Sequence, residues 1–149
     1  MTTSSLSLHP NILLVDDNRD GLLVRCSLLE EVGYRVQGAP NGEEGLKLFN
    51  SVSFDVVVTD YRMPRMNGVE LIQNIRKLNP NVRVILLSGF VEPLGLTEEN
   101  TGADVVIIKS SNEAAHLVRW VKRLVNRGTP RKPPAAQQSQ ASRKRTNGR

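Results

Sequence analysis

Side chains that could do chemistry follow four apolar segments of this sequence, each at the point where the segment ends. They are Asp16 and Asp17 after residues 11–15, Asp60 after 55–59, Ser88 after 82–87 and Lys109 after 105–108. Short apolar, β-branched runs of this kind predict buried strands, and the carboxyl ends of parallel strands meet at one edge of a sheet. The sequence therefore predicts three carboxylates, a hydroxyl and an ammonium around one cleft.

Such a cluster of carboxylates requires a cation. Carboxylates held close together repel one another, and one of them would be protonated unless a positive charge lay nearby. The predicted donors are all oxygen atoms, which favours Mg²⁺ or Mn²⁺ over zinc. His9 and His116 lie in the N-terminal segment and in the last predicted helix, and we interpret both as surface residues. Cys26 is the only cysteine, which excludes an internal disulfide and a Cys-rich zinc site and indicates a buried thiol in a reducing compartment.

A divalent cation beside a carboxylate, a lysine and a hydroxyl suits phosphoryl transfer. The cation and the Lys109 ammonium would neutralise the phosphoryl oxygens while the Asp60 carboxylate attacks phosphorus, which gives an aspartyl phosphate. A phosphatase with this nucleophile would want a nearby general acid, typically at position 62, but Arg62 cannot release a proton at neutral pH. A nucleotide site is also disfavoured, because the turn at 16–20 carries carboxylates in place of a glycine-rich loop.

The periodicity of apolar residues and the turn signals predict the elements that position these side chains. Strands are predicted at 11–15, 35–39, 55–59, 82–87 and 105–108, and helices at about 20–31, 41–51, 68–79, 96–101 and 112–125. Asn41 and Asn112 are the predicted caps of two of these helices. Strands and helices alternate with short connections, which predicts an α/β domain with a five-stranded parallel sheet and helices on both faces.

Each longer helix is expected to bury one apolar stripe. The predicted inward-facing residues are Leu22, Leu23, Cys26 and Leu29, then Leu46 and Phe49, then Val69, Leu71, Ile72, Ile75 and Leu78, and finally Leu117, Val118, Val121 and Val125. Trp120 lies beside the last stripe, as half-buried cover or as part of a partner-binding patch with Leu124. The stretch 89–103 has few apolar anchors, and we expect it to be the moving element.

Charge divides the 149-residue chain into a nearly neutral domain and a basic tail. The formal net charge is +5, yet residues 129–149 carry six cationic and no acidic side chains, which leaves −1 for the remainder. We predict a flexible N-terminus at 1–10, one domain at 11–128 and a disordered, solubilising tail at 129–149. Contact of the tail with nucleic acid is a less favoured alternative, because the tail has no aromatic side chain. Without a secretory signal or a membrane-length apolar run, the protein is expected to be cytoplasmic.

Over about residues 10–127, the chain resembles the response-regulator receiver domains of two-component signalling, chemotaxis-regulator-like members among them. The resemblance rests on LVDDN at 14–18, TDYRMP at 59–64 with MNG at 66–68, LSG at 87–89, GAD at 102–104, and Lys109. It implies a flavodoxin-like, doubly wound sheet with strand order 2-1-3-4-5. It also implies a switch protein that catalyses only its own phosphorylation and slow dephosphorylation.

The resemblance implies roles for the acidic residues. Asp60 matches the residue that accepts a phosphoryl group from the phosphohistidine of a histidine kinase or histidine phosphotransferase, in a Mg²⁺-dependent reaction. Asp17 matches a direct metal ligand, and Asp16 matches a carboxylate that acts through a metal-bound water. The backbone carbonyl of Arg62 matches a further metal ligand.

Other positions match the family pattern or depart from it. Ser88 matches the hydroxyl that moves to meet the phosphoryl group, Lys109 the ion-pairing lysine, and Gly89 a small residue that leaves room for the phosphodonor. Val106 stands where the family usually has Tyr or Phe, and Ser110 where it usually has Pro. These departures put the usual hydroxyl–aromatic switch in question, but not the chemistry at Asp60.

Two hypotheses of different classes follow. The first is a phosphoacceptor switch, stand-alone or part of a longer chain, with Phe90 as an alternative source of the missing switch aromatic. The second is a pseudo-receiver, or a receiver fragment of a hybrid kinase, that binds a partner protein without phosphorylation. The intact set of carboxylates, hydroxyl and lysine favours the first.

Overall fold

A computed structural model describes residues 9–89 and 95–127. The strands are β1 (Asn11–Val15), β2 (Arg35–Ala39), β3 (Val56–Asp60), β4 (Arg83–Ser88) and β5 (Val105–Ile108). The helices are α2 (Arg19–Val32), α3 (Gly42–Ser51), α4 (Gly68–Leu78), α5 (Glu98–Thr101) and α6 (Glu113–Arg127). All ten predicted elements are present, and the three strands predicted at 11–15, 35–39 and 105–108 have the predicted ends.

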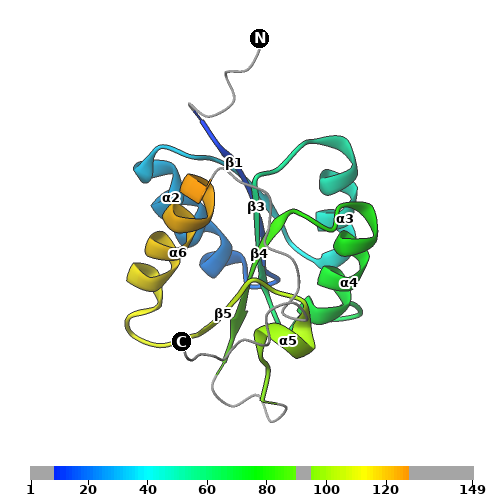
Figure 1. The fold of residues 1–149 in the computed structure, drawn as a ribbon. Helices are drawn as coiled ribbons and strands as arrows, with labels where there is room; N and C mark the ends of the chain where they lie inside the picture. Colours follow the sequence, from blue (N-terminus) through cyan, green and yellow to red (C-terminus); the bar gives the residue numbers. More distant parts are fainter. Residues whose placement is uncertain (1–8, 90–94, 128–149) are drawn as a thin grey trace, which may run out of the picture.

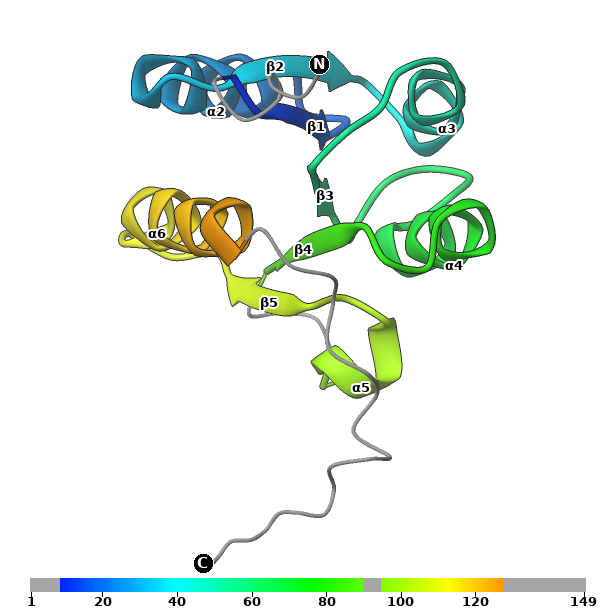
Figure 2. The ribbon, with the colours of Figure 1, turned by 45° about the horizontal axis from the view of Figure 1, so that its top comes forward.

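The five strands form one parallel sheet in the order β2-β1-β3-β4-β5, as predicted. Helices α2 and α6 cover one face of the sheet, and α3 and α4 cover the other (Figures 1 and 2). The short helix α5 lies beside the edge strand β5 and contacts α4. The chain order thus places β3 at the centre, with its carboxyl end between those of β1 and β4.

Two apolar layers hold this sandwich together, one on each face of the sheet. Leu13, Val57 and Ile72 belong to the layer under α3 and α4, whereas Leu14, Val58 and Leu117 belong to the layer under α2 and α6. All residues of β3 and β4 are buried. Strands covered on both faces need the continuous apolar runs that the sequence shows.

Side-chain caps fix where the helices begin. Asn18, Asn41 and Asn67 accept from backbone N–H groups in the first turns of α2, α3 and α4. At α4, the Glu70 side chain also accepts from the Asn67 N–H, which completes a capping box. Ahead of α6, the Ser110 hydroxyl accepts from the N–H of the predicted cap Asn112 at 3.3 Å. These caps set the ends of the loops that carry the predicted site.

Two predictions about burial were wrong, and Cys26, predicted to be buried, is only half-buried. Leu23 and Leu78, which we expected to face the core, are 57 and 51% exposed. Leu124 is buried against the sheet, so it cannot form a surface patch with Trp120, which is half-buried. The inward face of α6 is Leu117, Val121 and Leu124, and Val118 and Val125 lie at its margins. The helical period of 3.6 residues locates the centre of a buried stripe only to within one residue, and the packing of the helix on the sheet decides which residue it is.

The central strand is shifted by one residue from the prediction. Asp55 precedes β3 and is exposed, with its Oδ2 accepting from the Asn11 N–H at 2.8 Å, whereas Asp60 is the last residue of the strand. Ser88 likewise ends β4. Within the described residues, no helix is both long enough and apolar enough to cross a membrane. Phe90 and the predicted terminal segments, apart from residues 9 and 10, lie outside the described residues, so those predictions stand untested.

Candidate functional site

The carboxyl ends of the inner strands are tied to one another by backbone hydrogen bonds just beyond the regular ladder. The Asp16 N–H donates to the Ala39 carbonyl at 3.1 Å, and the Tyr61 N–H donates to the Leu87 carbonyl at 2.9 Å. The Lys109 N–H donates to the Ser88 carbonyl at 2.8 Å. The polar residues that follow the strands are therefore held on fixed backbone at one edge of the sheet.

Three of the predicted carboxylates come together there. One oxygen from each of Asp16, Asp17 and Asp60 lies within 4.8 Å of the others. Asp16 and Asp60 are buried and Asp17 is exposed, so the cluster opens to solvent on one side. Three oxygen donors with a net negative charge and an open side fit a hard divalent cation such as Mg²⁺, which keeps several waters.

Lys109 is brought against the same cluster, as predicted. Its Nζ lies 2.5 Å from Oδ1 of Asp60. Burial nevertheless raises the pKa of Asp60 to about 6, because desolvation and the charge of Asp16 outweigh the Lys109 ammonium and Arg25, which lower it. The lysine alone therefore does not offset the negative charge that the fold gathers at this edge.

The remaining predicted residues lie around the cluster. Ser88 is buried one residue beyond Leu87, the cross-strand partner of Asp60, and its hydroxyl donates to the Gly89 carbonyl at 3.3 Å. Arg62 lies in the exposed loop that follows β3. The hydroxyl and the loop thus belong to the same edge of the sheet as Asp60.

A close approach between α4 and the end of β3 holds this loop. The Gly68 N–H donates to the Tyr61 carbonyl at 2.8 Å. A Cβ at Gly68 would lie 2.4 Å from the Asp60 carbonyl oxygen and 2.9 Å from the Tyr61 Cα, so the backbone leaves room only for glycine. The turn that the sequence marks at Asn67-Gly68 therefore sets the position of Asp60 directly.

Comparison with known proteins identifies this architecture. The response regulator receiver domain family matches residues 12–121. The chain belongs to that family. A receiver domain protein (CheY-like) from Methanospirillum hungatei has the same fold, with a TM-score of 0.73 and 30% identity over 80% of this chain and 95% of that one. The response regulator TrrA of Thermotoga maritima, solved in complex with Mg²⁺-BeF, gives a TM-score of 0.70 and 35% identity over 77% of this chain and 98% of that one.

Curated relatives include both short and long proteins. The chemotaxis protein CheY of Thermotoga maritima is 32% identical over 100 residues, which is 66% of this chain and 83% of CheY. The probable transcriptional regulator ycf27 of Cyanidium caldarium is 33% identical over 127 residues, 83% of this chain. The match spans 51% of ycf27 and 33% of a receiver protein from Anaeromyxobacter, so the chain covers about half or less of those relatives.

Two charged residues of this receiver domain were missed by the sequence analysis. Arg25 of α2 makes a close ion pair with Asp16, and its Nε donates to Oε2 of Glu113 at 2.5 Å. Neither residue follows a strand, and 88 positions separate them. Only the charged position of Arg25 among apolar neighbours in α2 was a signal, and solvent exposure was its ordinary explanation.

The two positions that depart from the family pattern also have defined surroundings in this receiver domain. Val106 is half-buried against the layer under α3 and α4, and its N–H donates to Oε2 of Glu98 at 2.9 Å. Ser110 accepts from the Glu113 N–H through its carbonyl at 3.1 Å and from the Asn112 N–H through its hydroxyl. Ser110 thus helps to start α6, in a place where a proline could supply no hydroxyl.

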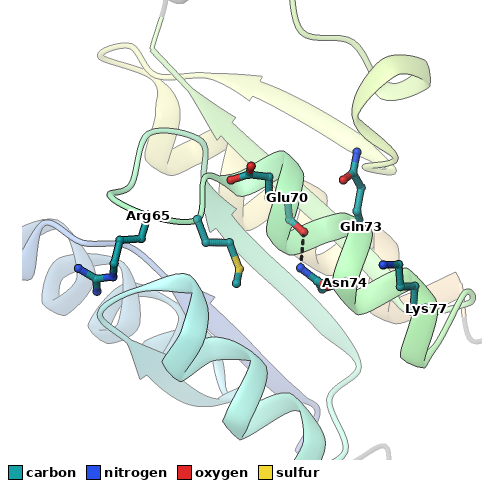
Figure 3. Close-up of a pocket in the computed structure, with 6 residues that line it drawn as sticks. Arg65, Glu70, Gln73, Asn74 and Lys77 are labelled. Atoms are coloured by element: carbon teal, nitrogen blue, oxygen red, sulfur yellow. Dashed lines mark hydrogen bonds between the residues drawn. The ribbon is translucent and has the colours of Figure 1, made fainter.

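A separate hollow of about 300 Å³ lies on the outer side of α4 (Figure 3). Polar side chains line it, among them Glu70, Gln73, Asn74 and Lys77 of α4, with Arg65 from the loop after β3. The Asn74 amide donates back to the Glu70 carbonyl at 3.0 Å. None of the predicted site residues lines this hollow, so it is distinct from the carboxylate cluster.

Proposed function

We propose that this receiver domain is a phosphoacceptor switch in which Asp60 forms an aspartyl phosphate. The observation that carries the proposal is the setting of Asp60, a buried carboxylate at the end of the central strand, clustered with Asp16 and Asp17 and paired with Lys109 at 2.5 Å. Such a group is a nucleophile held in a fixed place, with cations available for the oxygens of an incoming phosphoryl group.

The transfer divides among the residues of the chain as follows. An oxygen of the Asp60 carboxylate forms a bond to phosphorus while the bond from phosphorus to the donor's histidine nitrogen breaks, and that nitrogen keeps the electron pair. Lys109 moves from the carboxylate oxygen to a phosphoryl oxygen, and the Ser88 hydroxyl turns from the Gly89 carbonyl to donate to another. Gly89 leaves space for the donor.

We propose that Mg²⁺ occupies the cluster, held by Asp17 and Asp60 directly, by Asp16 through water, and by the backbone carbonyl of Arg62. When bound, the ion supplies positive charge that neutralises the phosphoryl oxygens. The all-oxygen donor set and the residual negative charge support this assignment, and TrrA, a structural neighbour, is described with Mg²⁺-BeF. Mn²⁺ remains a prediction from the donor chemistry alone.

The proposed phosphodonor is a histidine kinase or a histidine phosphotransferase of the cytoplasm, and the proposed output is a conformational change read by a partner protein. One relative is the virulence sensor protein BvgS of Bordetella bronchiseptica, which is 40% identical to this chain over 75 residues, or 6% of the length of BvgS. A conformational switch from 1:99 to 99:1 requires about 5.5 kcal/mol of preference for one state. New contacts from Ser88 and Lys109 to the phosphoryl group would supply part of it.

Intact-protein mass spectrometry after incubation with acetyl phosphate and MgCl₂ tests the proposal. We expect the wild-type chain to gain one phosphoryl group, the Asp60→Ala variant to gain none, and EDTA to abolish the gain. Asp55→Asn is the matched control, because Asp55 is an exposed carboxylate just before the same strand, and it should be labelled like wild type.

A wild-type chain that stays unlabelled, under conditions that label TrrA, would remove the phosphoacceptor proposal. The protein-binding pseudo-receiver would then be the better hypothesis, and Val106 and Ser110 would be its main support. Labelling that persists in Asp60→Ala would instead show that another residue is the acceptor.

A further inference from the structure

Arg25 lies between two carboxylates from distant parts of the chain. Its Nη1 donates to Oδ2 of Asp16, while its Nε and Nη2 donate to Oε2 and Oε1 of Glu113 at 2.5 and 3.2 Å. The side chains of Arg25, Asp16 and Glu113 are only 13, 2 and 14% exposed. Two-pronged arginine–carboxylate pairs that are shielded from solvent hold their geometry better than exposed pairs. This network joins the end of β1, the middle of α2 and the first turn of α6.

The network fixes how Asp16 faces the carboxylate cluster. Its Oδ1 accepts from the Asn18 N–H at 2.9 Å, and its Oδ2 accepts from Arg25, so the protein directs both oxygens. Gly21 leaves the space for this contact, because a Cβ there would lie 3.1 Å from both Arg25 Nη1 and Asp16 Oδ2. Asp16 therefore presents its remaining lone pairs in a set direction.

The carboxylates at this edge of the sheet outnumber the cationic side chains. The carboxylates of Asp16, Asp17, Asp60 and Glu113 face two cations, Lys109 and Arg25, which leaves two negative charges before any metal binds. Arg25 thus occupies part of the role that a divalent cation would fill. Two cations beside one carboxylate repel each other, more strongly where water is scarce.

Glu113 provides the alternative partner for that guanidinium. The Arg25–Glu113 pair lines a hollow of about 350 Å³ between α2 and the segment before α6, together with Ser110 and Ala114. The side chains therefore have room to shift toward one partner or the other. When a cation binds at Asp16, the Arg25 guanidinium can shift toward Glu113 without movement of the sheet.

We propose that Arg25 is a positioning residue of the cation site, dividing its guanidinium between Asp16 and Glu113, so that it sets the metal affinity of the cluster and couples metal occupancy to the start of α6. This inference rests on the proposed function, because it takes the carboxylate cluster to be the Mg²⁺ site. Cation binding weakens the contact of Arg25 with Asp16 and strengthens its contact with Glu113.

Titration of the full-length chain with MgCl₂ by isothermal calorimetry tests the inference. Arg25→Met removes the competing charge and should bind Mg²⁺ about tenfold more tightly than wild type. Arg25→Lys keeps the charge and should stay within about threefold of wild type. Glu113→Gln leaves Arg25 to Asp16 alone and should weaken Mg²⁺ binding by about threefold.

Arg25→Met and Glu113→Gln are expected to change the Mg²⁺ affinity in opposite directions, which separates a positioning role from a merely structural one. Arg25→Met should unfold at a lower temperature than wild type in EDTA, since it leaves two shielded carboxylates without their shared partner, whereas Glu113→Gln should lose less stability, since Arg25 keeps its pair with Asp16. A structural role alone would not tighten Mg²⁺ binding in one variant and weaken it in the other. Lys47→Met and Glu44→Gln, which remove the same charges from an exposed pair 3.4 Å apart on α3, should change the affinity by less than about twofold.

The outcomes are distinguishable from those of the proposed function. A wild-type chain that binds Mg²⁺, with Arg25→Met binding it equally or more weakly, overturns this inference alone. A wild-type chain that binds no Mg²⁺ overturns the inference and the metal assignment together. If Arg25→Met does not fold, Glu113→Gln decides, and unchanged or tighter binding in that variant overturns the inference.

Discussion

Two shielded guanidinium groups, those of Arg76 and Arg25, lie at opposite ends of the parallel strands, and they differ in the groups that they bind. We call these two ends of the sheet the amino edge and the carboxyl edge. Arg76 and Arg25 are nearly equally exposed, at 16 and 13%. Arg76 pairs with Asp104 at 3.1 Å and donates to the backbone carbonyls of Gly102, Pro80 and Val82, at the amino ends of β4 and β5. Among the residues that the structure describes, Arg25 donates to two carboxylates, at the carboxyl ends of the strands.

The difference lies in what else each carboxylate can bind. Asp104 accepts from Arg76 and from the Val84 N–H at 2.7 Å through the same oxygen, so the network closes on protein groups. The carboxylates near Arg25 outnumber the cations that face them, and one of them, Asp17, is open to solvent. A balanced network stabilises the fold, whereas an unbalanced one keeps affinity for a ligand. The predictions below probe that distinction.

The largest expected effect is at the balanced edge. Arg76→Met leaves Asp104 and several backbone carbonyls without the guanidinium, and we expect it to lower the free energy of unfolding by about 3–5 kcal/mol. Because the network lies at the other edge from the carboxylate cluster, the loss should be the same with and without MgCl₂. Urea unfolding followed by circular dichroism in both buffers measures it.

The matched control is Arg65→Met. Arg65 pairs with Glu43 at 3.4 Å on the surface, with both side chains more than half exposed, so its loss should cost less than about 0.5 kcal/mol. If Arg76→Met lowered the free energy of unfolding as little as Arg65→Met, the network at the amino edge would not stabilise the fold. If MgCl₂ recovered its stability, the two edges would be coupled rather than distinct.

The carboxylate cluster at the carboxyl edge should destabilise the metal-free protein as pH rises, because Asp60 becomes charged there. The pKa of Asp60 is raised from 3.8 to about 6, so the folded state favours its protonated form. The stability that this group contributes is present below pH 4 and is lost as pH rises through about 6, on the order of 3 kcal/mol at 1.36 kcal/mol per unit. Relative to wild type, Asp60→Asn should therefore gain stability between pH 4 and pH 7 in EDTA.

Urea unfolding of wild type and Asp60→Asn at several pH values isolates this term, because the other carboxyl groups are common to both proteins. Asp55→Asn serves as the control, because it removes an exposed carboxylate just before the same strand. Parallel stability profiles for wild type and Asp60→Asn would show that Lys109 already balances the charge of Asp60. The carboxyl edge would then resemble the amino edge.

The sequence predicted the carboxyl edge well because its residues follow strands. A parallel sheet brings the ends of its strands together, so Asp16, Asp17, Asp60 and Lys109 could be placed from the chain order alone. The apolar runs that carry them are buried on both faces and leave little choice of register. The fold and the central part of the candidate site were therefore accessible without a structure.

Contacts between helices were not accessible in the same way. The pairing of Arg25 with Glu113 depends on how α2 and α6 rotate and pack on one face of the sheet, which a stripe of apolar residues fixes only to within one position. The same uncertainty placed Leu23 and Leu78 inside, contrary to their exposure, and left the buried Leu124 out of the predicted stripe of α6. The anchor from Arg76 to the Gly102 carbonyl also joins side chain to backbone across 26 positions, with no sequence signal.

The smallest expected effect tests how far the amino-edge network holds α5. Arg76 binds the carbonyl of Gly102, just after α5, while Glu98 in the first turn of α5 accepts from the Val106 N–H at 2.9 Å. Glu98→Ala removes one charge-assisted hydrogen bond, so we expect a loss of about 1 kcal/mol or somewhat more in unfolding free energy. The Val106 amide should exchange with solvent faster than in wild type, as measured by hydrogen exchange and NMR.

Glu98→Gln is the control, because its amide oxygen can still accept from Val106 and should keep most of the protection of that amide. The neighbouring Glu99, also exposed on α5, offers Glu99→Ala as a second control that should leave Val106 exchange unchanged. Loss of protection confined to Val106 in Glu98→Ala would mean that Arg76 holds the end of α5 independently of its start. Equal loss at Ala103 and Asp104 would mean instead that Glu98 supports the whole connection and that the amino-edge network does not fix α5 by itself.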